Sequence, residues 1–156
     1  MSITKGQTAP NFKLFNHDKK EIELAQLKGK NVLLLFFPFA FTSTCTKELC
    51  SVRDNIATYN GLDAVVLGIS VDSPYTLVKY REDQKLNFDL LSDFNKTTSE
   101  AYGSIYETFG MGLKGVSKRS AFVVDKNGIV RYAEDLENAS DIPNFDNNHT
   151  TLQALK

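Results

Sequence analysis

A continuous apolar run, NVLLLFF at residues 31–37, constrains the fold more than any other part of the sequence. It predicts a central β-strand covered on both faces, because a strand with one solvated face alternates polar and apolar residues. A second buried strand is predicted within GLDAVVLGISVD, residues 61–72, and a segment with helical spacing separates the two. Two buried strands joined through a helix indicate parallel pairing by a right-handed crossover.

The segments around these strands carry further helix and strand signals. Residues 44–59 predict one helix of about four turns, with Thr42, Ser43 or Thr44 as the N-cap. The sequence therefore predicts one α/β domain over residues 1–156, in which helices flank both faces of a mixed sheet. The other predicted elements are an N-terminal hairpin over 12–24, a helix over 73–86 with Ser73 at its N-cap, a short strand over 88–93, a short helix over 95–103, a hairpin over 119–134 that turns at 125–128, and a final helix capped by Asn147 or Asn148.

Charge and hydropathy exclude several classes of partner. The net charge of −1, from 18 basic and 19 acidic residues, gives no strong field for nucleic acid or an anionic membrane. The longest apolar stretch, residues 32–41, is about half of the ~20 residues that a membrane-spanning helix needs. The first residues lack the basic and apolar regions of a secretion signal, so we expect a cytoplasmic location.

The two cysteines, Cys45 and Cys50, both fall in the predicted helix over 44–59. In a reducing compartment they indicate catalysis, redox sensing or metal binding rather than a static disulfide. Cys45 falls in the first turn, where free backbone N–H groups and the helix dipole favour a thiolate. The competing interpretation is a small apolar residue in the core. His17 and His149 show no metal-ligand spacing with the cysteines, so no metal site is expected.

The cysteine spacing bears on whether the two sulfurs can bond. Five residues of α-helix separate Cα atoms by about 8.6 Å, whereas a disulfide needs less than about 7 Å. A bond between Cys45 and Cys50 would therefore require the start of the helix to unwind, as in a redox cycle. Alternatively, Cys50 is a half-buried residue on the inner face of the helix.

Several segments resemble the peroxiredoxin family. FFPFAFTSTCTKEL, residues 36–49, is similar to the active-site segment of that family, in which a proline, a threonine or serine and a cysteine have the spacing of Pro38, Thr42 and Cys45. FPFAFT is similar to the alkyl hydroperoxide reductase E branch, and CTKELC has the cysteine spacing of the bacterioferritin-comigratory, or Q, branch. Other similar segments are GQTAPNF (6–12), VVLGISVDSPYTLVKY (65–80) and VSKRSAFVVDKNGIVRY (116–132).

The resemblance implies a thioredoxin-like fold and a role for each matching residue. Cys45 would be the peroxidatic nucleophile, which becomes a sulfenic acid. Thr42 would hydrogen-bond the sulfur and the peroxide, and Pro38 would shield the thiolate from water. Arg119 would lie beside the sulfur, where a fixed cation stabilises the thiolate, and Glu48 would orient that arginine.

Each of these roles has a simpler alternative. Thr42 could serve only as a helix cap, and Glu48 could be an exposed helix residue. Arg119 is one of several basic residues, which usually lie at the surface. The neighbouring Lys118 could be mistaken for the arginine beside the sulfur. Because side chains alternate along a strand, we expect residue 119 to point inward at the strand start and residue 118 to point away.

By this resemblance the chain reduces hydrogen peroxide and organic hydroperoxides without metal, haem or flavin. Cys50 would condense with the sulfenic acid of Cys45, and thioredoxin or another dithiol would reduce the disulfide. No cysteine follows Cys50, and the tail lacks a Tyr-Phe ending, so we expect resistance to over-oxidation.

Three alternatives stay open at this point, as does the choice between monomer and homodimer. In a one-cysteine peroxidase, Cys50 would be a spectator. In a redox-sensing module, unwinding of the helix would signal to a partner without useful turnover. A general disulfide oxidoreductase is disfavoured, since that activity usually employs C-x-x-C rather than C-x-x-x-x-C.

Overall fold

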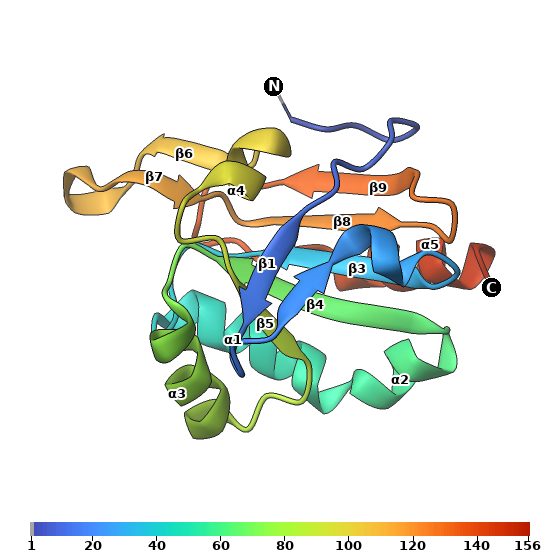
Figure 1. Ribbon diagram of the computed structural model, residues 1–156, viewed down its shortest axis with the longest axis horizontal. Helices are drawn as coiled ribbons and strands as arrows, with labels where there is room; N and C mark the ends of the chain where they lie inside the picture. Colours follow the sequence, from blue (N-terminus) through green and yellow to red (C-terminus); the bar gives the residue numbers. More distant parts are fainter. Residues whose placement is uncertain (1) are drawn as a thin grey trace.

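The structure is a computed structural model that describes residues 2–156. A seven-stranded sheet forms its centre, with strand order β2-β1-β5-β4-β3-β8-β9, and β6 and β7 form a separate hairpin that projects from one end (Figure 1). The elements are β1 (Lys13–Asn16), β2 (Glu21–Glu23), η1 (Leu24–Leu27), β3 (Asn31–Phe36), α1 (Ser43–Asp54), α2 (Ile56–Gly61), β4 (Ala64–Ser70), α3 (Pro74–Gln84), β5 (Asp89–Ser92), α4 (Thr97–Ala101), β6 (Ile105–Thr108), η2 (Gly110–Gly112), β7 (Lys114–Ser117), β8 (Ser120–Val124), β9 (Val130–Asp135) and α5 (Phe145–Ala154).

The sheet has the predicted mixture of strand directions. β3 pairs with β4 and β4 with β5 in parallel, whereas β1–β2, β1–β5, β3–β8 and β8–β9 are antiparallel. Both predicted hairpins are thereby confirmed. The parallel pairs follow from the crossovers through the helices that separate these strands in the chain.

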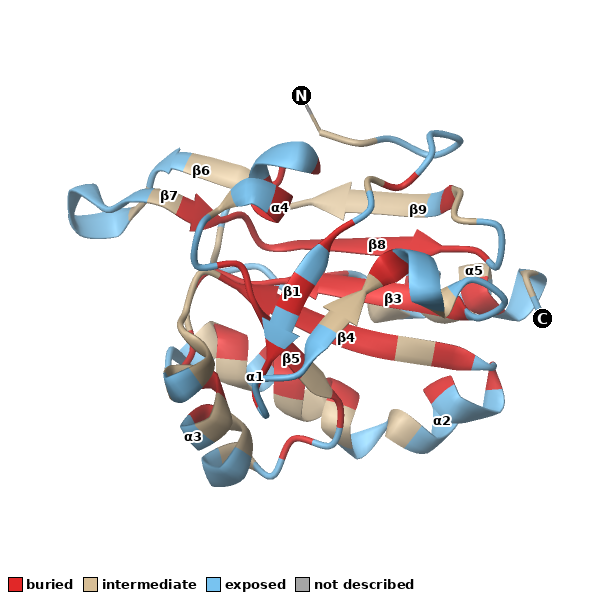
Figure 2. Ribbon diagram, in the orientation of Figure 1, coloured by how far each residue is buried: buried red, intermediate tan, exposed pale blue. Residues whose placement is uncertain are grey.

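The apolar run forms the central strand, as predicted. All six residues of β3 are buried, and most of β4 and β8 is buried with them (Figure 2). Successive side chains point to opposite faces of the sheet, so Leu33 and Leu35 join one apolar cluster while Leu34 and Phe36 join another. The strand therefore contributes to two cores at once.

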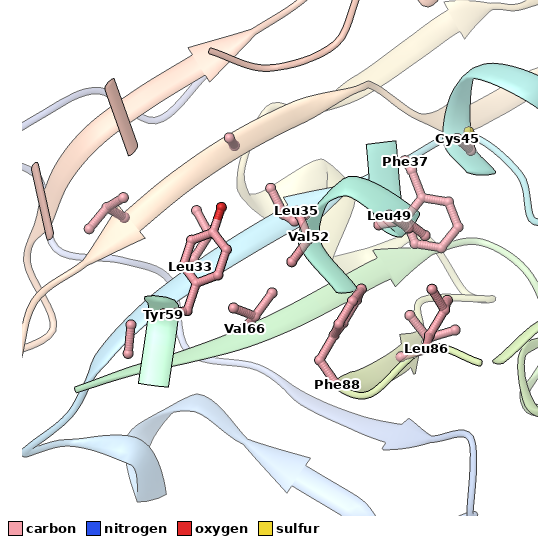
Figure 3. Packing of buried hydrophobic residues seen from close by; sticks show 14 of the residues in the cluster. Leu33, Leu35, Phe37, Cys45, Leu49, Val52, Tyr59, Val66, Leu86 and Phe88 are labelled. Atoms are coloured by element: carbon pink, nitrogen blue, oxygen red, sulfur yellow. The ribbon is translucent and has the colours of Figure 1, made fainter. Parts of the chain in front are cut away.

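Helices flank both faces of the sheet. The first cluster packs against α1, α2, α3 and α5 through residues that include Leu49, Tyr59, Leu77 and Leu152 (Figure 3). The second is closed by Leu24 of η1, Tyr102 after α4 and the N-terminal segment. Within the described part of the chain, no helix combines the length and the apolar character needed to cross a membrane.

The helix predicted as one element over 44–59 is divided in two. Asn55 separates α1 from α2, with φ −114° and ψ 16°. Its side-chain Nδ2 donates a hydrogen bond of 2.8 Å to the carbonyl oxygen of Ser51. Side-chain bonds of this kind compete with the helical backbone pattern, so the break has a local cause that periodicity does not reveal.

Two further features differ from the sequence prediction. The last helix is capped by Asn144, whose Oδ1 accepts from the backbone N–H of Asn147 at 3.0 Å, rather than by Asn147 or Asn148. The hairpin of β6 and β7 is absent from the prediction, because its two strands of four residues each are too short to show a clear strand periodicity.

We expect replacement of Leu35 by Ala to lower the free energy of unfolding by about 3 kcal/mol, since Leu35 is 0 % exposed at the centre of the sheet. Met111→Ala is the control: this side chain is 92 % exposed, and its loss should cost less than about 0.5 kcal/mol. Denaturant unfolding of the reduced protein measures both. An equal loss in the free energy of unfolding for Leu35→Ala and Met111→Ala would contradict the central position of β3.

Candidate active site

Cys45 lies in the first turn of α1 and is completely buried. It lies at one end of the apolar cluster, near Phe37 and Leu49 (Figure 3). Its Sγ accepts a hydrogen bond of 3.1 Å from Nη2 of Arg119. A cation in contact with the sulfur and the positive end of a helix both stabilise negative charge there.

Arg119 is held in position by three hydrogen bonds. It immediately precedes β8, and the antiparallel pairing of Phe36 with Ser120 brings it to the end of β3, where the chain leaves for α1. Nε donates to the carbonyl oxygen of Ala139 at 2.9 Å, Nη1 to Oε1 of Glu48 at 2.7 Å, and Nη2 to the Cys45 sulfur. The side chain is only 2 % exposed, so the guanidinium is fixed inside the protein.

Glu48 is also completely buried, and it lies one helical turn after Cys45 on the same face of α1. One carboxyl oxygen accepts from Arg119, while Oε2 has no hydrogen-bond partner among residues 2–156. Burial raises the pKa of Glu48 to about 7, although the neighbouring Arg119 cation opposes that rise. The interpretation of Glu48 as an exposed helix residue is therefore wrong.

Lys118 takes no part in this cluster. Its ammonium pairs instead with Asp135 at 3.5 Å and with Glu137. Lys118 and Arg119 both lie between β7 and β8, so strand alternation does not account for their different partners; Arg119 is the cation that contacts the cysteine.

The loop between β3 and α1 carries Pro38 and Thr42. Pro38 is buried, whereas Thr42 is exposed at the start of the helix. The Thr42 hydroxyl donates to the carbonyl oxygen of Phe39 at 2.9 Å and makes no capping bond to a helix N–H of the described chain. A capping role does not account for this side chain, although Thr42 occupies the N-cap position.

Other residues that the sequence did not indicate also hold this loop. Oδ2 of Asp72 accepts from the backbone N–H of Ala40 at 2.8 Å and from the hydroxyl of Ser70 at 2.7 Å. Phe41 adopts φ 67°, a left-handed conformation that is rare for a residue with a side chain, and its ring packs on that of Tyr80 at 5.0 Å between centroids. The only sequence signal is the position of Asp72 just after a buried strand.

Cys50 lies on the same helix but apart from Cys45. α1 is continuous between them, both thiols are free, and Cys50 Sγ donates to Oε1 of Gln84 in α3 at 3.5 Å. Gln84 has a second contact with α1, because Nη1 of Arg53 donates to the Gln84 backbone carbonyl oxygen at 2.6 Å. The structure therefore brings Cys45, Glu48 and Arg119 together and leaves Cys50 against α3.

The arrangement surrounds one thiol with groups that stabilise negative charge. A buried cysteine at a helix start, in contact with a fixed arginine, suits nucleophilic redox chemistry. Within residues 2–156, no three His, Cys, Asp or Glu side chains gather as metal ligands would.

Comparisons with known proteins identify the class. The AhpC/TSA family model matches residues 5–133. Alkyl hydroperoxide reductase E of Mycobacterium tuberculosis is 40% identical over 135 residues, 85% of each chain, and the putative peroxiredoxin bcp of Coxiella burnetii is 39% identical over 132 residues, 83% of this chain and 87% of that one. The crystal structure of peroxidoxin BcpB from Mycobacterium tuberculosis has a TM-score of 0.86 at 28% identity and covers 99% of both chains.

The chain belongs to the AhpC/TSA family, and its relatives are peroxiredoxins. The resemblance expected from the sequence and the thioredoxin-like fold are both confirmed. Relatives named for the alkyl hydroperoxide reductase E branch and for the bcp branch match at similar identity, as the mixed marks in the sequence suggested.

We expect Arg119→Leu to destabilise the protein by about 3 kcal/mol at pH 8, because a buried Glu48 carboxylate would lose its partner. The cost should be smaller at pH 5, where Glu48, with a pKa of about 7, is protonated. Denaturant unfolding of the natural chain and of Arg119→Leu at pH 5 and pH 8 measures the loss of unfolding free energy at each pH.

The control is Arg131→Leu, which removes the partner of Asp125 at a more exposed position. Its cost should be about 1 kcal/mol or less at both pH values. An Arg119→Leu cost that is the same at pH 5 and pH 8 would indicate lost packing rather than unpaired charge.

Proposed function

We propose that this chain is a thiol-dependent peroxidase that reduces hydrogen peroxide and organic hydroperoxides, with Cys45 as the nucleophile. The observation that carries the proposal is the hydrogen bond of 3.1 Å from the buried Arg119 guanidinium to the Cys45 sulfur. Membership of a family whose relatives are named peroxiredoxins and alkyl hydroperoxide reductase supports it.

In the reaction, the Cys45 thiolate attacks one peroxide oxygen. The S–O bond forms as the O–O bond breaks, and the second oxygen leaves as hydroxide or alkoxide and takes up a proton. Arg119 stabilises the charge that moves from sulfur to oxygen. Thr42, exposed beside the start of α1, would hydrogen-bond the incoming peroxide, while buried Pro38 would keep water from the sulfur.

The sulfenic acid is then resolved by Cys50. The Cys50 thiolate attacks the Cys45 sulfur, the S–S bond forms and water is lost once the departing hydroxyl is protonated. Because an intact helix holds the two residues too far apart, α1 must unwind between them and Cys50 must leave Gln84. A thioredoxin-type dithiol would reduce the disulfide by exchange.

One observation favours a second mechanism. In the reduced protein Cys50 is held between α1 and α3 by Gln84, and the helix between the cysteines is complete. If the helix stayed folded after oxidation, an external thiol would resolve Cys45 directly and Cys50 would be a spectator.

Two single substitutions separate these mechanisms. We expect Cys45→Ser to abolish peroxide reduction. Cys50→Ser should leave the first oxidation of Cys45 within about twofold of the unmodified rate, because the nucleophile and Arg119 are unchanged. Its thioredoxin-driven turnover should fall at least roughly tenfold, a barrier increase of about 1.4 kcal/mol.

Rapid-mixing kinetics of the first oxidation and steady-state turnover with thioredoxin, thioredoxin reductase and NADPH give the two rates. Unchanged turnover of Cys50→Ser would favour the one-cysteine mechanism. Activity retained by Cys45→Ser would overturn the proposed function as a whole.

A further inference from the structure

Two acidic groups share one cation inside the protein. Arg119 donates from Nη2 to the Cys45 sulfur at 3.1 Å and from Nη1 to the Glu48 carboxylate at 2.7 Å. Both acidic side chains are 0 % exposed and the arginine is 2 % exposed. The site can therefore balance one negative charge but not two without solvent.

We propose that Cys45 and Glu48 share a single ionisable proton, so that Glu48 takes up the proton when Cys45 becomes a thiolate. Glu48 would then be a positioning residue that sets the charge available to the sulfur through Arg119. The importance of this sharing for turnover rests on the proposed function, whereas the sharing itself follows from the site in the resting protein.

The orphaned carboxyl oxygen of Glu48 supports a neutral form. Oε2 is buried without a hydrogen-bond partner in the described chain, which is costly for a full carboxylate. The same burial raises the pKa of Glu48 to about 7, despite the opposing effect of Arg119. A proton is thus available on this group near neutral pH.

Within residues 2–156, no cation other than Arg119 makes an ion pair or hydrogen bond with Cys45 or Glu48. From α3, Tyr80 faces both groups, and burial raises its pKa so that it stays neutral. From the segment after β9, Ala139 contributes only a carbonyl oxygen to Arg119. Lys118, next in the chain to Arg119, pairs with Asp135 and Glu137. Cys50, the other acidic group facing Tyr80, lies on the same helix against α3.

The proton balance over one oxidation is complete. In the reduced protein that reacts, the shared proton lies on Glu48, so that Cys45 is a thiolate and Glu48 a neutral carboxyl. The thiolate then attacks the peroxide, the S–O bond forms as the O–O bond breaks, and the leaving hydroxide or alkoxide takes one proton from the medium. Because the sulfenic acid is neutral, Arg119 again pairs with Glu48 alone, and Glu48 releases one proton to the medium.

The pH dependence of Cys45 alkylation tests the sharing without peroxide. We compare Cys50→Ser with the double variant Cys50→Ser, Glu48→Gln, so that Cys45 is the one thiol that reacts with iodoacetamide. Removing the competing carboxylate should lower the pH of half-maximal reactivity by about one unit, the size expected for a nearby like charge. The wide, two-step titration expected for a coupled pair should become a single step.

A merely orienting role for Glu48 gives a different result. Gln keeps an acceptor for Arg119 Nη1, so the midpoint would not fall, and an unchanged or raised midpoint overturns the proposal. Asp54→Asn in the same background is the control, since it removes an exposed carboxylate from the same helix and should leave the midpoint unchanged.

A second measurement does not depend on the folding of a Glu48 variant. Addition of one equivalent of hydrogen peroxide to the reduced natural chain at pH 7 should remove the infrared band of a protonated carboxyl group and create a carboxylate band. Oxidation of Cys45 without this change overturns proton sharing while leaving the proposed function in place. Failure of Cys45 to oxidise overturns the proposed function, and the alkylation titration then decides the sharing alone.

Discussion

The buried guanidinium of Arg119 is the interaction on which the rest of the site depends. It connects the start of β8 to α1 by contacts with both Cys45 and Glu48. Burying such a charge is unfavourable unless it is paired and hydrogen-bonded. Here each of Nε, Nη1 and Nη2 has an acceptor, so the cost of burial is offset and the cation is held against the sulfur.

The fold supplies that geometry through its central strand. β3 lies between β4 and β8, and its end carries both the loop into α1 and, by register with Ser120, the neighbouring Arg119. Asp72, just after the adjacent β4, accepts a hydrogen bond from the backbone of the same loop. Cys45 is therefore positioned by residues at the ends of three neighbouring strands, while Cys50 lies farther along a helix that contacts α3.

Much of the fold could be predicted, because hydrophobic periodicity is a local property of the sequence. The run at 31–37 and the Ser73-Pro74 helix start gave elements close to those observed. The break at Asn55 could not be predicted, since it depends on a side-chain bond that competes with the helix. In the site, the position of Cys45 at a helix start was readable from its neighbours. The burial of Glu48 was not, because its partner lies 71 positions away.

The chemistry of Cys45 and Cys50 is tested most directly by the denatured intact mass of the reduced protein after one equivalent of hydrogen peroxide and alkylation. We expect loss of both free thiols with removal of two hydrogens, which corresponds to a Cys45–Cys50 disulfide. A protein that still carries two alkylated thiols after seconds of exposure would contradict the assignment of Cys45 as a peroxide-reactive nucleophile. A gain of one oxygen with Cys50 still alkylated would contradict resolution within the helix.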